Sequence, residues 1–293
     1  MKILVFGSNS QIAKTMKEKK IYLQYELIFL SRKECDFNNL ANLEALIYNF
    51  KPNLCINTSA FTQVDQAEKF QVETSIVNHY AVKKIAEITN KLSIPFIHFS
   101  SDYIFDGEIN RPYTESDSPN PLSVYGLSKL NGDKEIINCN LKHVIIRTSW
   151  VVSRYNNNFI LKILDKLKKN EDINVVNDQF GRLTSANYLA DILYFFINKI
   201  QNNFKAWGIY NICCSGIVSW FDIALYIKEI YKSQNPNSNA NIYMVSSEIN
   251  ENRAQRPKYS VLDTTKIEIL TGISPPFWKD EIKKILINDI LIR

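Results

Sequence analysis

The sequence lacks the features that direct a protein into or across a membrane. Its first ten residues, MKILVFGSNS, form a short strand-like run that enters a turn, without the long apolar core of a signal peptide. No apolar run approaches the roughly 18 residues that a transmembrane helix needs. We therefore expect a soluble, cytoplasmic protein with no membrane partner.

Sequence patterns for metal ions and disulfides are also missing. The cysteines number five, an odd count without a C-x-x-C pair, and Cys55 and Cys213 lie in strand-like apolar runs, as buried free thiols do. The three histidines, His79, His98 and His143, show no ligand spacing. We expect each histidine to be a packed or surface residue, and we expect no metal site.

The charge distribution does not favour a nucleic-acid partner. The formal net charge is +5 over 293 residues, and the lysines are scattered apart from short clusters such as Lys166, Lys168 and Lys169. This distribution is typical of a solvated surface; an anionic, phosphate-bearing substrate is the alternative partner for some of the basic residues. A hydrophobic content of 45% and this length allow one large or two modest domains.

What the sequence does contain is an alternation of apolar runs and helical patterns. Strands are expected over residues 2–6, 25–30, 54–57, 95–99 and 143–148, and helices over residues 11–20, 42–50, 72–92 and 125–138. This alternation predicts an α/β fold with a Rossmann-type doubly wound parallel sheet.

The pattern loosens beyond residue 150, which predicts two domains. We expect residues 1–150 to form an NAD(P)-binding Rossmann domain. Residues 151–293 would form mainly a smaller C-terminal substrate-binding domain, with some segments within about 175–213 returning to the Rossmann sheet.

The first predicted strand runs into a turn that is poor in glycine. A strand, a turn and a helix at the start of a chain are typical of dinucleotide-binding folds, which hold a pyrophosphate at the turn and the helix N-terminus. Of the usual three glycines only Gly7 is present, and Ser10 and Ala13 occupy the other two places. Because these are the smallest replacements, a cofactor can still approach the backbone closely.

The second predicted strand ends at Ser31, Arg32 and Lys33. In dinucleotide-binding folds an acidic residue at this place binds the adenosine ribose, whereas an arginine accommodates a 2′-phosphate. The run has no acid and two cations, which favours NADPH as cofactor, with NADH possible. An ordinary solvated turn is the alternative interpretation.

A candidate catalytic cluster lies between residues 97 and 129. Tyr125 and Lys129 stand four apart at the head of a predicted helix and so share one face. Ser101 follows a predicted strand, where open α/β sheets place their ligands. An acid, a cation and a hydroxyl suit the protonation of a carbonyl oxygen while hydride reaches its carbon. Tyr80 and Lys84 have the same spacing without this context, and we interpret them as a helix face.

Taken together, the motifs resemble those of the extended short-chain dehydrogenase/reductases and, within them, the dTDP-4-dehydrorhamnose reductase family. The resemblance covers nearly the whole chain and rests on NTSAFTQVDQAE (57–68), SSDYIFDG (100–107), SVYGLSKLNGD (123–133), RTSWVV (147–152), VVNDQFGRLT (175–184), YNICCSG (210–216) and RPKYSVLDT (256–264).

The resemblance implies an NAD(P)H-dependent reduction of the 4-keto group of dTDP-4-dehydro-L-rhamnose, in nucleotide-sugar biosynthesis for cell-surface polysaccharides. Tyr125 would be the general acid, Lys129 would lower its pKa and bind the nicotinamide ribose, and Ser101 would hydrogen-bond the keto oxygen. A free tyrosine has a pKa near ~10, and a nearby ammonium stabilises its phenolate. The Ser101 hydroxyl would stabilise the developing alkoxide, as in an oxyanion hole.

The resemblance also implies contact residues. The cofactor would touch Ser10, Gln11, Ile12, Asp36, Phe37, Ala60, Phe61 and Thr62, in addition to Gly7, Ser31 and Arg32. The substrate would touch Asp102, Tyr103, Trp150, Gln179 and Arg256. The guanidinium of Arg256 suits the phosphate oxygens of a nucleotide-sugar, and a surface arginine before a proline is the alternative.

Departures from the family pattern leave other functions open. Val152 stands where an aromatic residue often follows the RTSWV run, and residues 14–16 lack the glutamate that some members link to a metal at a dimer interface, so no Mg²⁺ site is expected. One alternative is another nucleotide-sugar 4-ketoreductase or epimerase. The other is a non-catalytic regulatory relative, against which the intact catalytic residues argue. We expect a monomer or a homodimer with a dTDP-linked keto sugar as substrate.

Overall fold

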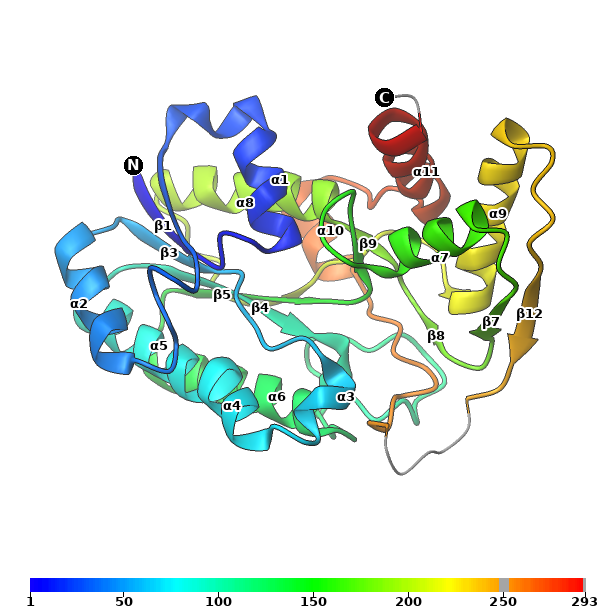
Figure 1. The fold of residues 1–293 in the computed structure, drawn as a ribbon. Helices are drawn as coiled ribbons and strands as arrows, with labels where there is room; N and C mark the ends of the chain where they lie inside the picture. The colour runs from blue at the N-terminus through cyan, green and yellow to red at the C-terminus, as the bar shows by residue number, and fades with distance from the viewer. Residues whose placement is uncertain (248–252, 292–293) are drawn as a thin grey trace.

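The fold is built on a parallel sheet of six strands (Figure 1). The computed structural model describes residues 1–247 and 253–291. The strands lie in the order β10-β5-β4-β3-β1-β2, and every neighbouring pair is parallel. They are β1 (Lys2–Phe6), β2 (Glu26–Leu30), β3 (Leu54–Asn57), β4 (Phe96–Ser101), β5 (His143–Thr148) and β10 (Gly208–Asn211). The predicted Rossmann-type doubly wound sheet is confirmed.

The direction of winding reverses next to β1. The chain first moves outward from β1 to β2, and it then returns past β1 to β3, β4 and β5. Open α/β sheets bind ligands where the strand order reverses, in the crevice outside the carboxyl ends of the strands. The carboxyl ends of β1, β2 and β3 therefore mark the expected cofactor site.

Helices cover both faces of this sheet (Figure 1). One face carries α1 (Gln11–Glu18) and α8 (Ala186–Gln201), and the other carries α2 (Leu40–Phe50), α5 (Ala81–Lys91) and α6 (Val124–Cys139). Alternate residues of β1 enter opposite cores: Ile3 and Val5 pack on the first side, and Leu4 and Phe6 on the second. Burial on both sides explains why these strands read as continuous apolar runs.

The predicted helix over residues 72–92 is interrupted by a π-helical turn. Short helices α3 (Val64–Ala67) and α4 (Gln71–Ser75) lead into the π turn at Ile76–Tyr80, after which α5 continues. The turn carries Asn78, whose amide accepts from Phe61 N–H at 2.8 Å and donates to Phe61 C=O at 3.1 Å. Such turns often occur at functional sites. Here the turn fixes the loop that follows β3.

The remainder of the chain forms a smaller region that lies mainly at the right of Figure 1, across the picture from α2 and β1. It contains α7 (Phe159–Lys168), α9 (Trp220–Gln234), α10 (Thr265–Thr271), α11 (Trp278–Lys283), a π-helical segment (Lys284–Leu291) and three two-stranded pairs: β7 (Ile173–Val176) with β12 (Ile242–Val245), β8 (Phe180–Gly181) with β11 (Val218–Ser219), and β6 (Val151–Val152) with β9 (Thr184–Ser185). Within residues 175–213, β10 joins the main sheet, whereas β7 pairs outside it. The division into two functional domains stays a prediction.

The five cysteines are free, and Cys55 and Cys213 are fully buried, as predicted. Among residues 1–247 and 253–291, no helix has the length and apolar content needed to cross a bilayer.

Candidate active site

The three predicted catalytic residues come together where β4 meets α6. β4 ends at Ser101, and α6 begins after Ser123, whose hydroxyl caps the helix by accepting from Gly126 N–H at 3.1 Å. The hydroxyl of Ser101 lies close enough to Tyr125 to act on the pKa of its phenol. Lys129 lies one helical turn further along α6, and its side-chain nitrogen is 2.5 Å from the carbonyl oxygen of Phe99 in β4.

Close packing at a glycine makes this meeting possible. A Cβ atom added to Gly126 would lie 2.2 Å from the carbonyl oxygen of Tyr103, well inside normal contact distance. The missing side chain lets the first turn of α6 rest on the backbone that follows β4. The ring of Tyr103 meets that of Tyr125 edge-on, with centroids 5.8 Å apart, so the two chain segments share an aromatic contact as well.

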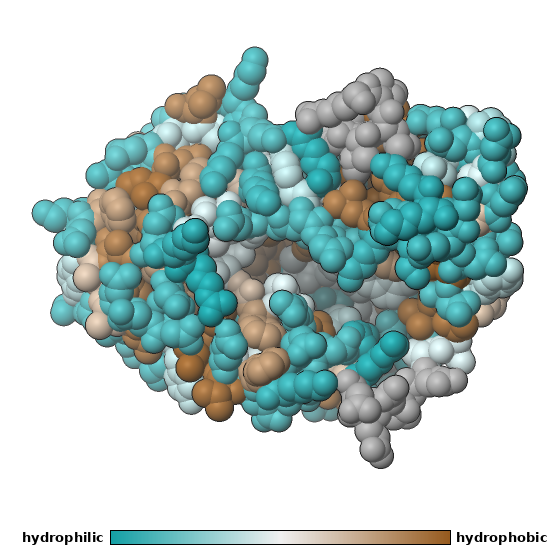
Figure 2. All heavy atoms as spheres, in the orientation of Figure 1, coloured by the Kyte–Doolittle hydropathy of each residue, from teal (hydrophilic) through white to brown (hydrophobic). Residues whose placement is uncertain are grey.

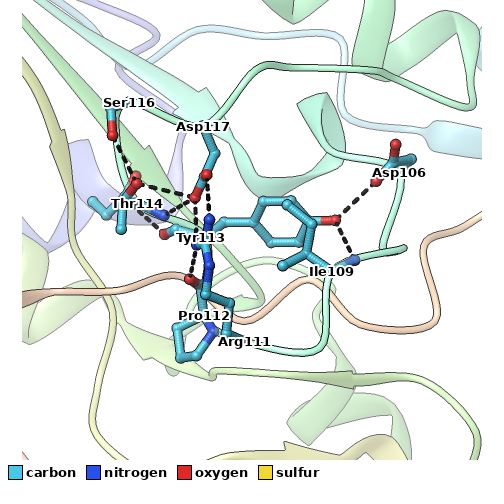
Figure 3. A network of polar contacts seen from close by, with 9 residues as sticks. Asp106, Ile109, Arg111, Pro112, Tyr113, Thr114, Ser116 and Asp117 are labelled. Carbon is cyan, nitrogen blue, oxygen red and sulfur yellow. Dashed lines mark hydrogen bonds and ion pairs between the residues drawn. The ribbon is translucent and has the colours of Figure 1, made fainter.

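The polar loop between β4 and α6 is held by its own side chains (Figure 3). Arg111 donates two hydrogen bonds to the carboxylate of Asp117, at 2.8 and 2.7 Å, and the hydroxyl of Tyr113 donates to Asp106 at 2.8 Å. Asn211 of β10 donates to the backbone carbonyl of Tyr113 at 2.9 Å. These bonds tie the loop to itself and to the main sheet, so Ser101 and Tyr125 are connected by an ordered segment.

Burial dominates the ionisation of the cluster. It raises the pKa of Tyr125 to about 12, opposed by the nearby hydroxyl of Ser101 and supported by the charges of Asp102 and Asp133. Burial lowers the pKa of Lys129 to about 8, opposed by the Asp133 carboxylate. The pKa of Asp102 rises to about 7 for the same reason, although it accepts hydrogen bonds from Ser101 and from a serine late in the chain. A buried tyrosine that keeps its proton at neutral pH suits a general acid.

A pocket at the reversal point of the sheet collects most of the predicted cofactor residues. Its lining includes Gly7, Ser31, Arg32, Asp36, Phe37, Ala60 and Phe61. Gly7 has a φ of +86°, and an added Cβ would lie 2.8 Å from the backbone nitrogen of Ser59, so only glycine fits here. A pocket whose backbone leaves no room for side chains, at the carboxyl ends of parallel strands, fits the adenosine half of a dinucleotide.

Apart from Tyr125 and Lys129, which were also expected to contact the cofactor, four predicted cofactor residues lie outside this pocket. The Ser10 hydroxyl caps α1 by accepting from Ala13 N–H at 3.0 Å, and it donates to Thr58 at 2.8 Å. The side-chain amide of Gln11 donates to the backbone carbonyl of Val151 at 3.0 Å. Ile12 is buried in the core. Thr62 is exposed. Ser10, Gln11 and Ile12 therefore have structural roles for their side chains; cofactor contact through their backbone stays a prediction.

The fold surrounds the Ser31–Lys33 turn with acids that the run itself does not contain. Glu34 accepts from the backbone N–H of Ser31 at 2.7 Å. Arg32 lies 3.3 Å from Glu73 and 3.9 Å from Asp36, and its side chain is 71% exposed. Exposed ion pairs of this kind contribute little to stability. Breaking them would therefore cost Arg32 little if a phosphate offered better contacts. A wider surface hollow outside this pocket shares only Glu73 with it and contains none of the predicted catalytic residues.

The predicted substrate residues come from separate segments of the chain. Trp150 follows β5 with a φ of +47°, unusual for a large residue, and its ring stacks on Trp220 with centroids 3.8 Å apart. Arg256 donates to both oxygens of Asp65, at 2.8 and 2.9 Å, and its guanidinium lies near enough to Tyr103 for the two groups to act on each other's pKa. Gln179 is buried immediately before β8. The arrangement places Arg256 beside the aromatic pair of the active site; its role in binding substrate stays a prediction. Figure 2 shows the surface hollowed near the centre of this face.

Comparison with known proteins identifies the family. A family described as "RmlD substrate binding domain" matches residues 1–290. Two curated proteins called dTDP-4-dehydrorhamnose reductase, from Sinorhizobium fredii (strain NBRC 101917 / NGR234) and Aggregatibacter actinomycetemcomitans, are 33% and 34% identical over 288 residues, covering 98% and 97% of this chain and 97% and 98% of the relatives. The chain belongs to the dTDP-4-dehydrorhamnose reductase family. A crystal structure of dTDP-4-dehydrorhamnose reductase from Bacillus anthracis str. Ames in complex with NADP is similar at a TM-score of 0.89 and 27% identity, covering 98% of this chain and 99% of that one.

Membership of the dTDP-4-dehydrorhamnose reductase family agrees with the motifs, yet the site holds residues that the motifs did not single out. His98, expected to be a packed or surface residue, is fully buried in β4 and lies 3.1 Å from the nitrogen of Lys129. Trp220 supports Trp150, and Asp65 holds Arg256. The sequence signal that could have singled out His98 is its position as a histidine inside an apolar strand. Among the described residues, no three His, Cys, Asp or Glu side chains gather as a metal site.

Proposed function

We propose that this chain is an NAD(P)H-dependent nucleotide-sugar 4-ketoreductase that converts dTDP-4-dehydro-L-rhamnose to dTDP-L-rhamnose. The observation that carries the proposal is that Ser101 at the end of β4 lies beside Tyr125 at the start of α6, with Lys129 one helical turn further on, in a chain of this reductase family. The pair provides one hydroxyl to hold a carbonyl oxygen and one to protonate it.

Each catalytic residue has a distinct task in this reaction. Ser101 donates a hydrogen bond to the keto oxygen as negative charge develops there. Tyr125 passes its phenolic proton to the same oxygen, and its raised pKa means that the phenol carries that proton at neutral pH. Lys129, when protonated, stabilises the phenolate that remains. A proton from solvent then restores the phenol for the next turnover.

The pocket at the reversal point fits NADPH, with NADH as the alternative cofactor. Gly7, Asp36 and Phe61 would hold the adenosine half, and Arg32 would turn to the 2′-phosphate. When bound, the reduced nicotinamide supplies the hydride for the carbonyl carbon. The B. anthracis reductase crystallised with NADP supports this choice, as does the exposed, replaceable ion pair of Arg32.

The substrate would lie between the main sheet and the smaller region, which we propose as a substrate-binding domain made mainly of residues 151–293. Asp102, Tyr103 and Trp150 would line the sugar, and Gln179 would contact it from the position just before β8. Arg256 would hold the diphosphate, since a guanidinium that already pairs with a carboxylate has the geometry for phosphate oxygens. We further propose a cytoplasmic enzyme that acts as a monomer or homodimer on a dTDP-linked keto sugar.

A substrate panel tests this function. Purified protein and NADPH would be mixed with dTDP-4-dehydro-L-rhamnose, with its UDP counterpart, and with a dTDP sugar that has no keto group. We expect rapid loss of reduced nicotinamide with the first, slower loss with the second and none with the third. Faster turnover of the UDP sugar would replace the proposed substrate, and no loss with either keto sugar would refute the reductase function.

A further inference from the structure

His98 occupies a position that the proposed reaction does not yet explain. It lies within β4, three residues before Ser101, and is completely buried. Its ring nitrogens face two different neighbours. Nδ1 is 3.2 Å from the amide nitrogen of Asn57 in β3, and Nε2 is 3.1 Å from the side-chain nitrogen of Lys129 in α6. A strand residue thus joins the catalytic lysine to the neighbouring strand.

The orientation of Asn57 determines which ring nitrogen of His98 carries the proton. The Oδ1 atom of Asn57 accepts from the backbone N–H of Ser59 at 2.9 Å, so the amide group must direct its NH₂ toward His98. An NH₂ group only donates, and Nδ1 must therefore accept. Because complete burial holds the pKa of His98 well below its usual value, the ring is neutral. Its single proton is then on Nε2, directed at Lys129.

The proton on Nε2 of His98 disfavours the ammonium form of Lys129, whose nitrogen faces it. A protonated lysine has three donors and no acceptor, whereas a neutral amine has a lone pair that can accept from Nε2–H. The remaining contact of the Lys129 nitrogen is donation to Phe99 C=O at 2.5 Å, which both forms can make. The opposite tautomer would bring two donors together at Asn57. The hydrogen-bond pattern is therefore complete only with the amine form of Lys129.

We propose that His98 is a positioning residue for Lys129: its Nε2–H, fixed by Asn57, favours the amine over the ammonium and so sets the pH at which Lys129 loses its proton. The proposal rests on the proposed function for its catalytic meaning. In the resting protein the lysine is held back against β4. When its nitrogen leaves His98 and gains a proton, it becomes the cation that Tyr125 needs.

Other charged groups near Lys129 act on its titration, and they stay unchanged in the test. Asp133 lies one turn further along α6 and favours the ammonium, and it is itself 3.7 Å from Arg147 of β5. Tyr125 precedes Lys129 by one turn and is neutral at working pH. From β3 the neighbour of His98 is the uncharged Asn57. The two substitutions of His98 below therefore change one donor and leave these charges in place, whereas Asn57→Asp is used only to reverse the tautomer.

The first measurement is nitrogen NMR of the three histidines in the protein without cofactor or substrate. The expected result is the Nε2–H tautomer for His98 in the parent and the Nδ1–H tautomer in Asn57→Asp, because a carboxylate accepts where the amide donated. The Nδ1–H tautomer in the parent would overturn the proposal. This measurement does not depend on which substrate the enzyme uses, so it separates failure of this inference from failure of the proposed function.

The second measurement is the titration of Lys129, followed by the chemical shift of its labelled ε-carbon and by the alkaline limb of kcat/KM. One ordinary hydrogen bond corresponds to about tenfold in proton affinity, or about one pH unit. Replacing the ring by an apolar side chain, His98→Leu, should move both titrations up by about that amount. His98→Gln keeps a donor near the place of Nε2 and should restore the parent value. Equal titration in the parent and both variants would show that His98 only fills space.

Discussion

A single added methyl group at the start of α6 provides a sensitive test of the active-site geometry. In Gly126→Ala the new Cβ would lie 2.2 Å from the carbonyl oxygen of Tyr103. Carbon and oxygen atoms in close contact are normally about 3.3 Å apart, so α6 and the segment after β4 must separate by about 1 Å. A misplacement of about 1 Å can cost on the order of 10²-fold in rate. Overpacking of this kind also costs roughly 1–3 kcal/mol of stability.

The assay is steady-state kinetics with NADPH and the keto sugar, together with thermal unfolding. We expect kcat of Gly126→Ala to fall on the order of 10²-fold, because the strain separates Tyr125 from Ser101. The control is Leu127→Ala, whose side chain is exposed on the same turn and should change stability by less than about 0.5 kcal/mol. A kcat of Gly126→Ala within threefold of the parent would refute the reasoning that this close approach aligns the catalytic pair.

Three further substitutions test the roles assigned to single residues. Tyr125→Phe removes only the proton donor and should lower kcat by roughly 10²–10⁴-fold with little change in cofactor binding. The control is Tyr80→Phe, which has the same spacing to a lysine and should be near neutral. A loss of kcat under tenfold in Tyr125→Phe would contradict the assignment of Tyr125 as the general acid. The value of kcat/KM should be higher with NADPH than with NADH, and this preference should reverse in the double variant Ser31→Asp with Arg32→Ala. A parent value that is equal for the two cofactors, or higher with NADH, would show that the Ser31–Lys33 turn does not select the cofactor. Arg256→Ala should raise the KM of the nucleotide-sugar much more than it changes kcat, and an unchanged KM would place Arg256 outside the substrate site.

The sequence was sufficient to predict features that depend on local period and chain order. Helical spacing placed Tyr125 and Lys129 on one face, and the end of an apolar strand placed Ser101 at the carboxyl edge of the sheet. The alternation of strands and helices predicted a parallel sheet, and the run from strand to turn to helix at the start of the chain predicted β1 and α1. These features depend on neighbouring residues or on a regular sequence pattern, so they can be predicted from the sequence alone.

Features that depend on contacts between distant segments were not predictable in the same way. The π turn that presents Asn78 to the loop after β3 has no sequence signature of its own. Glu73 reaches Arg32 only because α4 folds back over the end of β2, and His98 reaches Lys129 only because β4 lies under α6. In each case the residue type is ordinary at its position, and the partner lies tens of residues away.

The measurement that tests the central claim most directly follows a label from cofactor to product. NADPH that carries deuterium at the transferable position would be incubated with the protein and dTDP-4-dehydro-L-rhamnose, and the sugar would be analysed by NMR. The account predicts dTDP-L-rhamnose with one deuterium at C4 for each NADPH oxidised, and loss of this transfer in Tyr125→Phe. A product without deuterium at C4, or an epimerised keto sugar with the NADPH unchanged, would contradict it.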